Sequence, residues 1–147
     1  MLNKDFKDML SCLLEEKVEF LLVGGYALGV YGHPRATKDI DLWIWTDPVN
    51  SEKTYRALAT FGAPLANVTP MAFSESGVIF QIGVPPNRID LITKADGIEF
   101  KACYQNRAIV SIEGLDIPVI SREDLILNKR TTDRPQDRVD VDVLEAN

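Results

Sequence analysis

The sequence is short of the residues that several kinds of site require. Its 147 residues include one histidine and two cysteines. A site that needs several imidazoles is therefore excluded, and we do not expect bound zinc. The two thiols, Cys12 and Cys103, lie in no cysteine cluster. We expect them to be reduced, as in a cytoplasmic protein, rather than joined in a disulfide.

Long apolar runs are also missing. The longest uncharged candidate, residues 57–73, is interrupted by one glycine, two prolines and one asparagine. It does not match the roughly 20 apolar residues of a membrane-spanning helix. The N-terminus carries Lys4, Asp5, Lys7 and Asp8 where a signal peptide would have an apolar segment. We therefore expect neither a membrane anchor nor a signal peptide.

Basic residues are fewer than acidic ones, at 16 against 22, which gives a formal net charge of -6. This balance disfavours broad, non-specific binding to nucleic acid, because such binding needs many Lys and Arg contacts to phosphates. It leaves open an RNA substrate held on a local basic strip. With 46% apolar and 26% charged residues, the composition is that of a globular protein. We expect residues 1–147 to form a single domain with one site.

Hydrophobic periodicity and turn residues predict a mixed α/β (α+β) fold. The predicted helices cover residues 4–16, 26–31, 48–61, 121–129 and 135–145. The predicted strands cover residues 18–23, 39–45, 78–84, 88–93, 108–112 and 115–120. The last four strands are expected to form two hairpins. A small mixed sheet with flanking helices and C-terminal helices follows from this order.

The most informative feature is the pair Asp39 and Asp41, which lies on the predicted strand over residues 39–45. Residues two apart on a strand point to the same face, so the two carboxylates project together. Asp90 alternates with apolar neighbours in the same way, and it reaches the same patch if its strand lies beside that of Asp41. Oxygen-only ligands favour Mg²⁺ or Mn²⁺. Three such acids could hold two ions about 3.5–4 Å apart for displacement at phosphorus.

Each part of this pattern also has a plainer interpretation. An Asp-x-Asp pair is common by chance, and Asp90 alone could be a solvated strand residue. Trp43 and Trp45 share the acidic face, where they could stack on a base or a partner, or simply pack at the edge of the sheet. Gly-Gly at 24–25 could bring the backbone close to a triphosphate, or form only a tight strand-to-helix turn.

Taken together, the ordered motifs resemble a known superfamily. They are Val23-Gly-Gly-Tyr-Ala27, then Arg35-x-Thr37-x-Asp39-Ile-Asp41-Leu, then Ile89-Asp90-Leu91. This set resembles the nucleotidyltransferases related to DNA polymerase β. It is most similar to the minimal bacterial members, the AbiEii-like toxin nucleotidyltransferases and the small antibiotic nucleotidyltransferases. The resemblance runs from about residue 18 to residue 145.

The resemblance implies a palm-type sheet and specific residue roles. Asp39, Asp41 and Asp90 would be the catalytic residues and the ligands of Mg²⁺ or Mn²⁺. The implied nucleotide-binding residues are Gly24, Gly25, Tyr26, Arg35, Thr37 and Lys129. Lys129 would face the phosphates of the nucleotide, although an exposed helix lysine is an equally good interpretation. Two positions depart from the family pattern: Tyr26 replaces a serine, and Gln136 replaces a lysine before Asp137.

The resemblance therefore predicts Mg²⁺-dependent transfer of a nucleoside monophosphate from a nucleoside triphosphate such as ATP to a hydroxyl or phosphate. The acceptor could be RNA such as tRNA, a small molecule such as an antibiotic, or a protein, and the chain could be the toxin of a toxin–antitoxin pair. The alternative is a non-catalytic nucleotide-binding or partner-binding module with the same fold. A homodimer or a protein partner could close the open side of the cleft.

Overall fold

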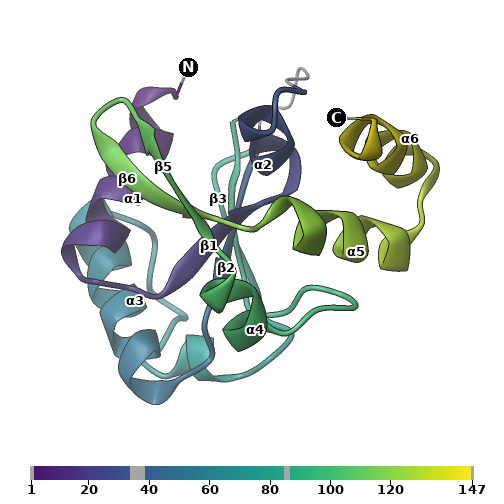
Figure 1. The fold of residues 1–147 in the computed structure, drawn as a ribbon. Helices are drawn as coiled ribbons and strands as arrows, with labels where there is room; N and C mark the ends of the chain where they lie inside the picture. The colour runs from purple at the N-terminus through teal and green to yellow at the C-terminus, as the bar shows by residue number, and fades with distance from the viewer. Residues whose placement is uncertain (1, 34–38, 85–86, 147) are drawn as a thin grey trace.

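A six-stranded mixed sheet organises the fold (Figure 1). The computed structural model describes residues 2–33, 39–84 and 87–146. The strands are β1 (Phe20–Val23), β2 (Ile40–Ile44), β3 (Ile79–Ile82), β4 (Ile89–Ile92), β5 (Ala108–Ile112) and β6 (Leu115–Val119). Within the described residues, the helices are α1 (Lys4–Glu15), α2 (Gly24–Val30), α3 (Pro48–Phe61), α4 (Phe100–Gln105), α5 (Arg122–Thr132) and α6 (Pro135–Glu145), with a 3₁₀ turn, η1 (Ala72–Ser74).

The strand order is β3-β4-β2-β1-β6-β5. Both predicted hairpins are confirmed, because β3 pairs antiparallel with β4 and β5 pairs antiparallel with β6. β1 is antiparallel to β2 and parallel to β6. The neighbouring strands β2 and β4 are parallel, and their register sets Asp41 opposite Asp90. The strand of Asp90 therefore lies beside that of Asp41, as the predicted acidic patch requires.

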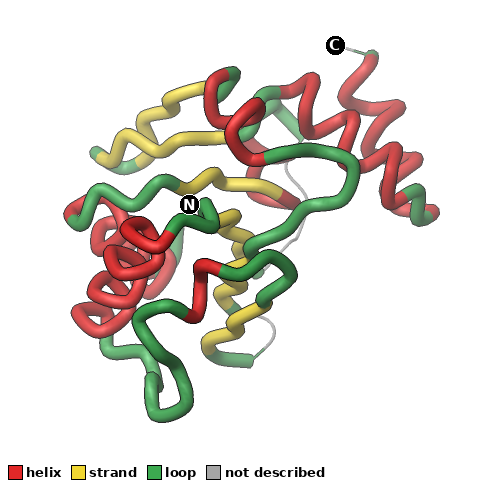
Figure 2. Tube along the Cα trace, turned by 90° about the horizontal axis from the view of Figure 1, so that it is seen from below, coloured by secondary structure: helices red, strands yellow, loops and turns green. Residues whose placement is uncertain are grey.

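The two faces of β2 have different neighbours. Ile40, Leu42 and Ile44 are fully buried and belong to the main hydrophobic core. Figures 1 and 2 show α1 and α3 side by side on one side of the sheet, and α5 and α6 on the other. The strict alternation of the sequence thus separates a core-forming set of side chains from the acidic set.

Helix boundaries follow the expected capping chemistry. The Asp47 side chain accepts a hydrogen bond from the backbone N–H of Asn50 at 3.2 Å, and α3 ends at Gly62 in the left-handed region, with φ 95°. At the start of α5, Ser121 Oγ accepts from the backbone N–H of Asp124 at 3.1 Å. These caps place the beginning and end of α3 and the beginning of α5 where the sequence predicts them.

Several elements differ from the prediction. The helix α4 and the turn η1 were not predicted. α4 has only six residues and no side-chain N-cap, so it has few local signals and forms because Phe100 packs into the core. α2 begins at Gly24 rather than at Tyr26, so the two glycines lie in its first turn.

Helix α4 also decides the position of the two tryptophans. Trp43 is 2% exposed and meets the Phe100 ring edge-on, with ring centroids 5.2 Å apart. Trp45 stacks on the same ring at 5.6 Å and carries the Lys101 ammonium 4.7 Å from its centroid. The packing interpretation is confirmed for Trp43, which is buried, and the rings of both tryptophans contact Phe100.

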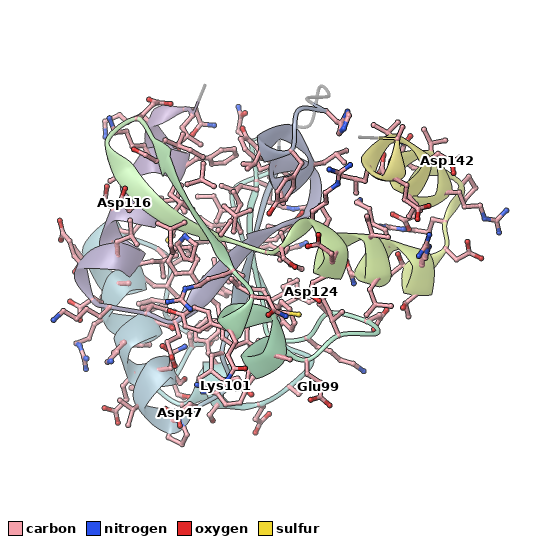
Figure 3. All side chains as sticks on the ribbon, viewed as in Figure 1. Asp47, Glu99, Lys101, Asp116, Asp124 and Asp142 are labelled. Atoms are coloured by element: carbon pink, nitrogen blue, oxygen red, sulfur yellow. The ribbon has the colours of Figure 1, made fainter. Side chains whose placement is uncertain are left out.

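Two further observations concern membrane-spanning helices and the two cysteines. No helix among the described residues is long and apolar enough to cross a membrane. Cys12 and Cys103 are both free thiols. Burial and the neighbouring Asp124 raise the pKa of Cys103 to about 12, so this thiol is not reactive near neutral pH. Figure 3 shows Asp124 at the beginning of α5, near α4.

One buried polar side chain joins three segments of the fold. Asn50, in the first turn of α3, is 3% exposed. Its Oδ1 accepts from the backbone N–H of Glu19 at 2.7 Å. Its Nδ2 donates to the carbonyl oxygens of Glu19 at 3.1 Å and of Trp45 at 2.9 Å. Asn50 therefore connects α3 to the segments that enter β1 and leave β2.

Replacing Asn50 with alanine should lower the free energy of unfolding by about 1–3 kcal/mol, because the backbone groups of Glu19 and Trp45 lose their partner. Chemical denaturation measures this change. Glu52→Ala is a matched control, because Glu52 is exposed on the same helix, and it should change stability by less than about 0.5 kcal/mol. Equal effects of the two substitutions would contradict the assignment.

Candidate active site

Three carboxylates meet on one face of the sheet. Asp41 lies on β2 opposite Asp90 on β4, and Asp39 precedes β2 on the same face. The apolar neighbours on β4, Ile89 and Leu91, are buried on the other face. The predicted acids are thus brought together by strand alternation and by the parallel register of β2 and β4.

An arginine that was not predicted lies within this cluster. Arg88 Nε donates to Asp90 Oδ1 at 2.7 Å, and its Nη2 donates to Asp90 Oδ2 at 3.1 Å. The same Nη2 lies 3.4 Å from Asp39 Oδ2, and the Arg88 backbone N–H donates to Asp39 Oδ1 at 3.0 Å. Arg88 therefore neutralises part of the charge of Asp39 and Asp90 and connects the two strands.

Within residues 2–33, 39–84 and 87–146, no arginine or lysine forms an ion pair with Asp41, whose side chain is hydrogen-bonded to Asp90. Burial is the main cause that raises its pKa to about 6, and repulsion by Asp90 and Asp39 adds to the shift. The ionised form of Asp41 is therefore held at an energetic cost near neutral pH. A cation bound beside Asp41 would remove that cost.

Gly24 allows the chain to pass directly over Asp41. Its φ is +68°, a conformation that favours glycine. A Cβ atom built on Gly24 would lie 2.3 Å from Asp41 Oδ2. No side chain fits there unless Asp41 moves. The first glycine of the Gly-Gly pair is therefore required by the close approach of the α2 backbone to the carboxylate.

A cavity of about 510 Å³ opens beside these residues. Gly24 and Asp41 line one part of it, and Lys129 and Arg134 line another. Lys94, which follows β4, also lines it. A cavity of this size, with an anionic wall and several cations, suits a ligand that carries both a metal ion and phosphates.

Lys129 is neither exposed nor isolated. It is 7% exposed, so the interpretation as an ordinary surface lysine is wrong. Its Nζ donates to Asp140 Oδ2 at 2.9 Å and lies 3.8 Å from Asp137 Oδ1. Both aspartates belong to α6, so the position of this ammonium group depends on the packing of α6 against α5.

The acids have the right chemistry for a divalent cation. Hard oxygen ligands suit Mg²⁺ or Mn²⁺, and the raised pKa of Asp41 indicates uncompensated negative charge. Among the described residues, no three acidic, histidine or cysteine side chains already surround a common metal position. The reason is geometric, since Asp90 and Asp39 turn toward Arg88. Full coordination by all three acids would require the Arg88 side chain to move.

The remaining predicted residues lie in different positions. Gly25 lies in the first turn of α2 beside Gly24. The Tyr26 ring packs edge-on against Phe6 at 5.5 Å, on the α1 side. Its role in nucleotide binding stays a prediction. Arg35 and Thr37 lie outside the described residues.

Three residues of the site were not predicted. Arg88 could have been noticed, because it is two residues before Asp90 and shares its face on an extended strand. Arg134 directly precedes the helix predicted for residues 135–145, and no local pattern indicates that it lines the cavity. Lys94 gives no local signal, because its place at the cavity follows from the end of β4 and the loop after it.

Comparisons with known proteins agree with this geometry. The family model described as nucleotidyltransferase of unknown function (DUF6036) matches residues 2–145. No curated protein sequence matches the chain. The solved structures below are less than 25% identical to the chain, so they support the fold alone.

Three solved structures share the fold over most of their length. The lincosamide antibiotic adenylyltransferase LnuA, bound to lincomycin, is 18% identical with a TM-score of 0.62, and the match covers 99% of this chain and 97% of LnuA. ANT(2")-Ia, in complex with adenylyl-2"-tobramycin, is 17% identical with a TM-score of 0.61, and the match covers 95% of this chain and 84% of ANT(2")-Ia. TM1012 from Thermotoga maritima, described as a candidate nucleotidyltransferase, is 15% identical with a TM-score of 0.62, and the match covers 90% of this chain and 85% of TM1012.

The family match extends over nearly the whole chain, and the mixed sheet is that of the solved nucleotidyltransferases. The chain belongs to this family of nucleotidyltransferases.

Proposed function

We propose that this protein transfers a nucleoside monophosphate from a Mg²⁺-bound nucleoside triphosphate, such as ATP, to a hydroxyl group of a small molecule. The observation that carries the proposal is the division of charge around one cavity. Asp41 and Gly24 line it together with Lys94, Lys129 and Arg134, and Asp96 and Asp137 line it as well. This arrangement suits a triphosphate whose α-phosphate is near the acids and whose outer phosphates contact the cations.

In the proposed reaction, the acceptor hydroxyl attacks the α-phosphorus, a new P–O bond forms, and the bond to pyrophosphate breaks. Asp39, Asp41 and Asp90 would hold the metal ions, which supply positive charge to the reacting phosphate and the leaving group. Asp90 would accept the proton of the attacking hydroxyl once Arg88 has moved away from it. Lys129 and Arg134 would neutralise the pyrophosphate as it leaves.

A small-molecule acceptor is favoured over RNA by two arguments. The net charge of -6 disfavours extensive contact with a polyanion. LnuA is bound to lincomycin, and ANT(2")-Ia is in complex with an adenylylated tobramycin. A second cavity of about 1080 Å³ adjoins the first and shares Lys94, Ala95 and Asp96 with it, so there is space for a ligand beside the triphosphate.

Two other functions follow from the same site. Transfer to tRNA, as in a toxin of a toxin–antitoxin pair, rests only on the resemblance of the motifs to the toxin nucleotidyltransferases. A non-catalytic module would bind the nucleotide without turnover. The presence of all three acids and of the surrounding cations favours the enzyme over the module.

Transfer of label from each α-labelled nucleoside triphosphate with Mg²⁺ tests the function. We expect label to enter a low-molecular-weight fraction of a soluble extract, and to be absent with the Asp39→Ala/Asp41→Ala variant. Label in the tRNA fraction would instead identify RNA as the acceptor and contradict the proposal of a small molecule. Binding of the nucleotide without any transfer would establish the non-catalytic module instead.

Asp41→Asn should make the metal-free protein more stable. The folded pKa of Asp41 is raised from 3.8 to about 6, so stability falls as the pH rises between these two values, and the cost is absent only below the lower one. In EDTA at pH 7.5, we expect Tm to rise, by roughly 2–4 °C for each kcal/mol recovered. Mg²⁺ should raise the Tm of the wild type more than that of the variant. A lower Tm for Asp41→Asn in EDTA would contradict this account.

Gly24→Ala should weaken binding of the Mg²⁺–triphosphate complex at least about tenfold, because the new Cβ displaces Asp41 and the positive φ becomes strained. Isothermal titration with a non-hydrolysable triphosphate measures the loss. Gly114→Ala is a matched control, since Gly114 also has positive φ, at +83°, but its Cβ would meet no atom within 4 Å. Equal nucleotide affinity in the two folded variants would rule out the proposed role of Gly24.

A further inference from the structure

The hairpin of α5 and α6 contains a network of two buried carboxylates, one buried cation and one exposed cation. Asp137 and Asp140 are 2% and 3% exposed, and Lys129 is 7% exposed. Lys129 Nζ donates to Asp140 at 2.9 Å. Asp137 Oδ2 accepts from Arg134 Nε at 2.7 Å and from Thr132 Oγ1 at 2.7 Å. The network therefore controls the positions of the basic groups of Lys129 and Arg134.

Each carboxylate of the network has more than one donor. Asp137 also accepts from the backbone N–H of Arg134 at 3.1 Å, and Asp140 Oδ1 accepts from Gln136 Nε2 at 3.0 Å. Although burial acts in the opposite direction, the hydrogen bonds from Arg134 and Thr132 hold the pKa of Asp137 well below its usual range. Both side chains are thus fixed acceptors of defined orientation.

Stability alone does not account well for this network. Removing two charges from water is costly, and a buried ion pair is often no more stabilising than an apolar pair of similar size. Lys129 is the one buried basic residue within the described part of the chain. A packing role for α6 would be served by residues such as Val141 and Leu144, which are already buried.

The network faces the candidate active site. Lys129, Thr132, Arg134 and Asp137 line the cavity of about 510 Å³ that also contains Asp41. The Arg134 side chain is 74% exposed, while its partner Asp137 is buried at 2%. Its guanidinium is also within electrostatic range of Asp41. Of the two carboxylates, Asp137 lines this cavity beside Arg134, and Asp140 is not among the lining residues.

We propose that Asp140 and Asp137 on α6 are positioning residues that orient the Lys129 ammonium and the Arg134 guanidinium toward the triphosphate. The inference rests on the proposed function and deepens it. The carboxylates contact neither the phosphates nor the reacting atoms, and they act through the two cations. Packing of α6 on α5 then determines whether the site can bind a nucleotide.

Asp140→Asn tests this role, because it keeps the shape of the side chain and removes its charge. We expect the Kd of a non-hydrolysable Mg²⁺–triphosphate complex to rise about tenfold, because Lys129 would lose a charge-assisted contact with the phosphates. In steady-state assays, KM for the triphosphate should rise more than kcat falls. Asp142→Asn is the matched control on the same helix (Figure 3), since Asp142 is exposed. It should change Kd less than about twofold.

A double-mutant cycle distinguishes positioning from general stability. If Asp140 acts through Lys129, Asp140→Asn should change Kd less than about twofold in a Lys129→Met background. The variant Lys129→Met/Asp140→Leu removes both buried charges, so it should fold, as measured by circular dichroism, while binding the triphosphate weakly.

The inference would be overturned by any of the following results. Tighter binding by Asp140→Asn would mean that the carboxylate only reduces the positive potential of the cavity. An unchanged Kd, or an equal loss with and without Lys129, would assign α6 a purely structural role. If the wild type bound no nucleoside triphosphate at all, the proposed function itself would fail. Binding and turnover by the wild type with an unaffected Asp140→Asn variant would remove only the positioning role.

Discussion

The repulsion among Asp39, Asp41 and Asp90 is the constraint on which the rest of the site depends. The parallel register of β2 and β4 places these carboxylates together on one face of the sheet, away from the core. Arg88 compensates two of them, while Asp41 keeps a pKa raised to about 6. The apolar residues of the opposite face hold this unfavourable arrangement in place. A site that is costly without a cation is well suited to bind one.

The second half of the site comes from the C-terminal helices. α5 and α6 lie beside the sheet (Figure 1), each contributes a buried leucine to the core, and with the turn between them they supply Lys129 and Arg134 to the cavity. Their buried carboxylates neutralise these cations and orient them. The site therefore combines an acidic wall on a rigid sheet with a basic wall on a helical hairpin. Charge complementarity between these walls and a Mg²⁺–triphosphate is the basis of the proposed activity.

Much of the fold could be predicted from sequence because its signals are local. Alternation in β2 and β4, the cap formed by Asp47 and Pro48, and Gly62 at the end of α3 are short-range patterns. Helix α4 could not be predicted in this way, because it depends on the packing of Phe100 against Trp43 and Trp45. The same is true of side-chain partners. Nothing near Lys129 in sequence indicates that α6 buries it.

The acids of the candidate site were accessible to prediction for a similar reason. Asp39 and Asp41 share a face on any strand, and only the position of Asp90 needed the sheet topology. The contact of Gly24 with Asp41 and the two ion pairs of Arg88 require three-dimensional neighbours that no spacing rule provides. Sequence patterns thus predicted the acidic cluster, and the fold shows which groups surround it.

A crystal structure with Mg²⁺ and a non-hydrolysable nucleoside triphosphate is the most direct test of the account. It should show the metal held by Asp41 and Asp90, the Arg88 side chain displaced from Asp90, and the outer phosphates in contact with Lys129 and Arg134. A triphosphate bound elsewhere, with Arg88 still paired to both acids, would contradict the central claim that these two walls form one nucleotide site.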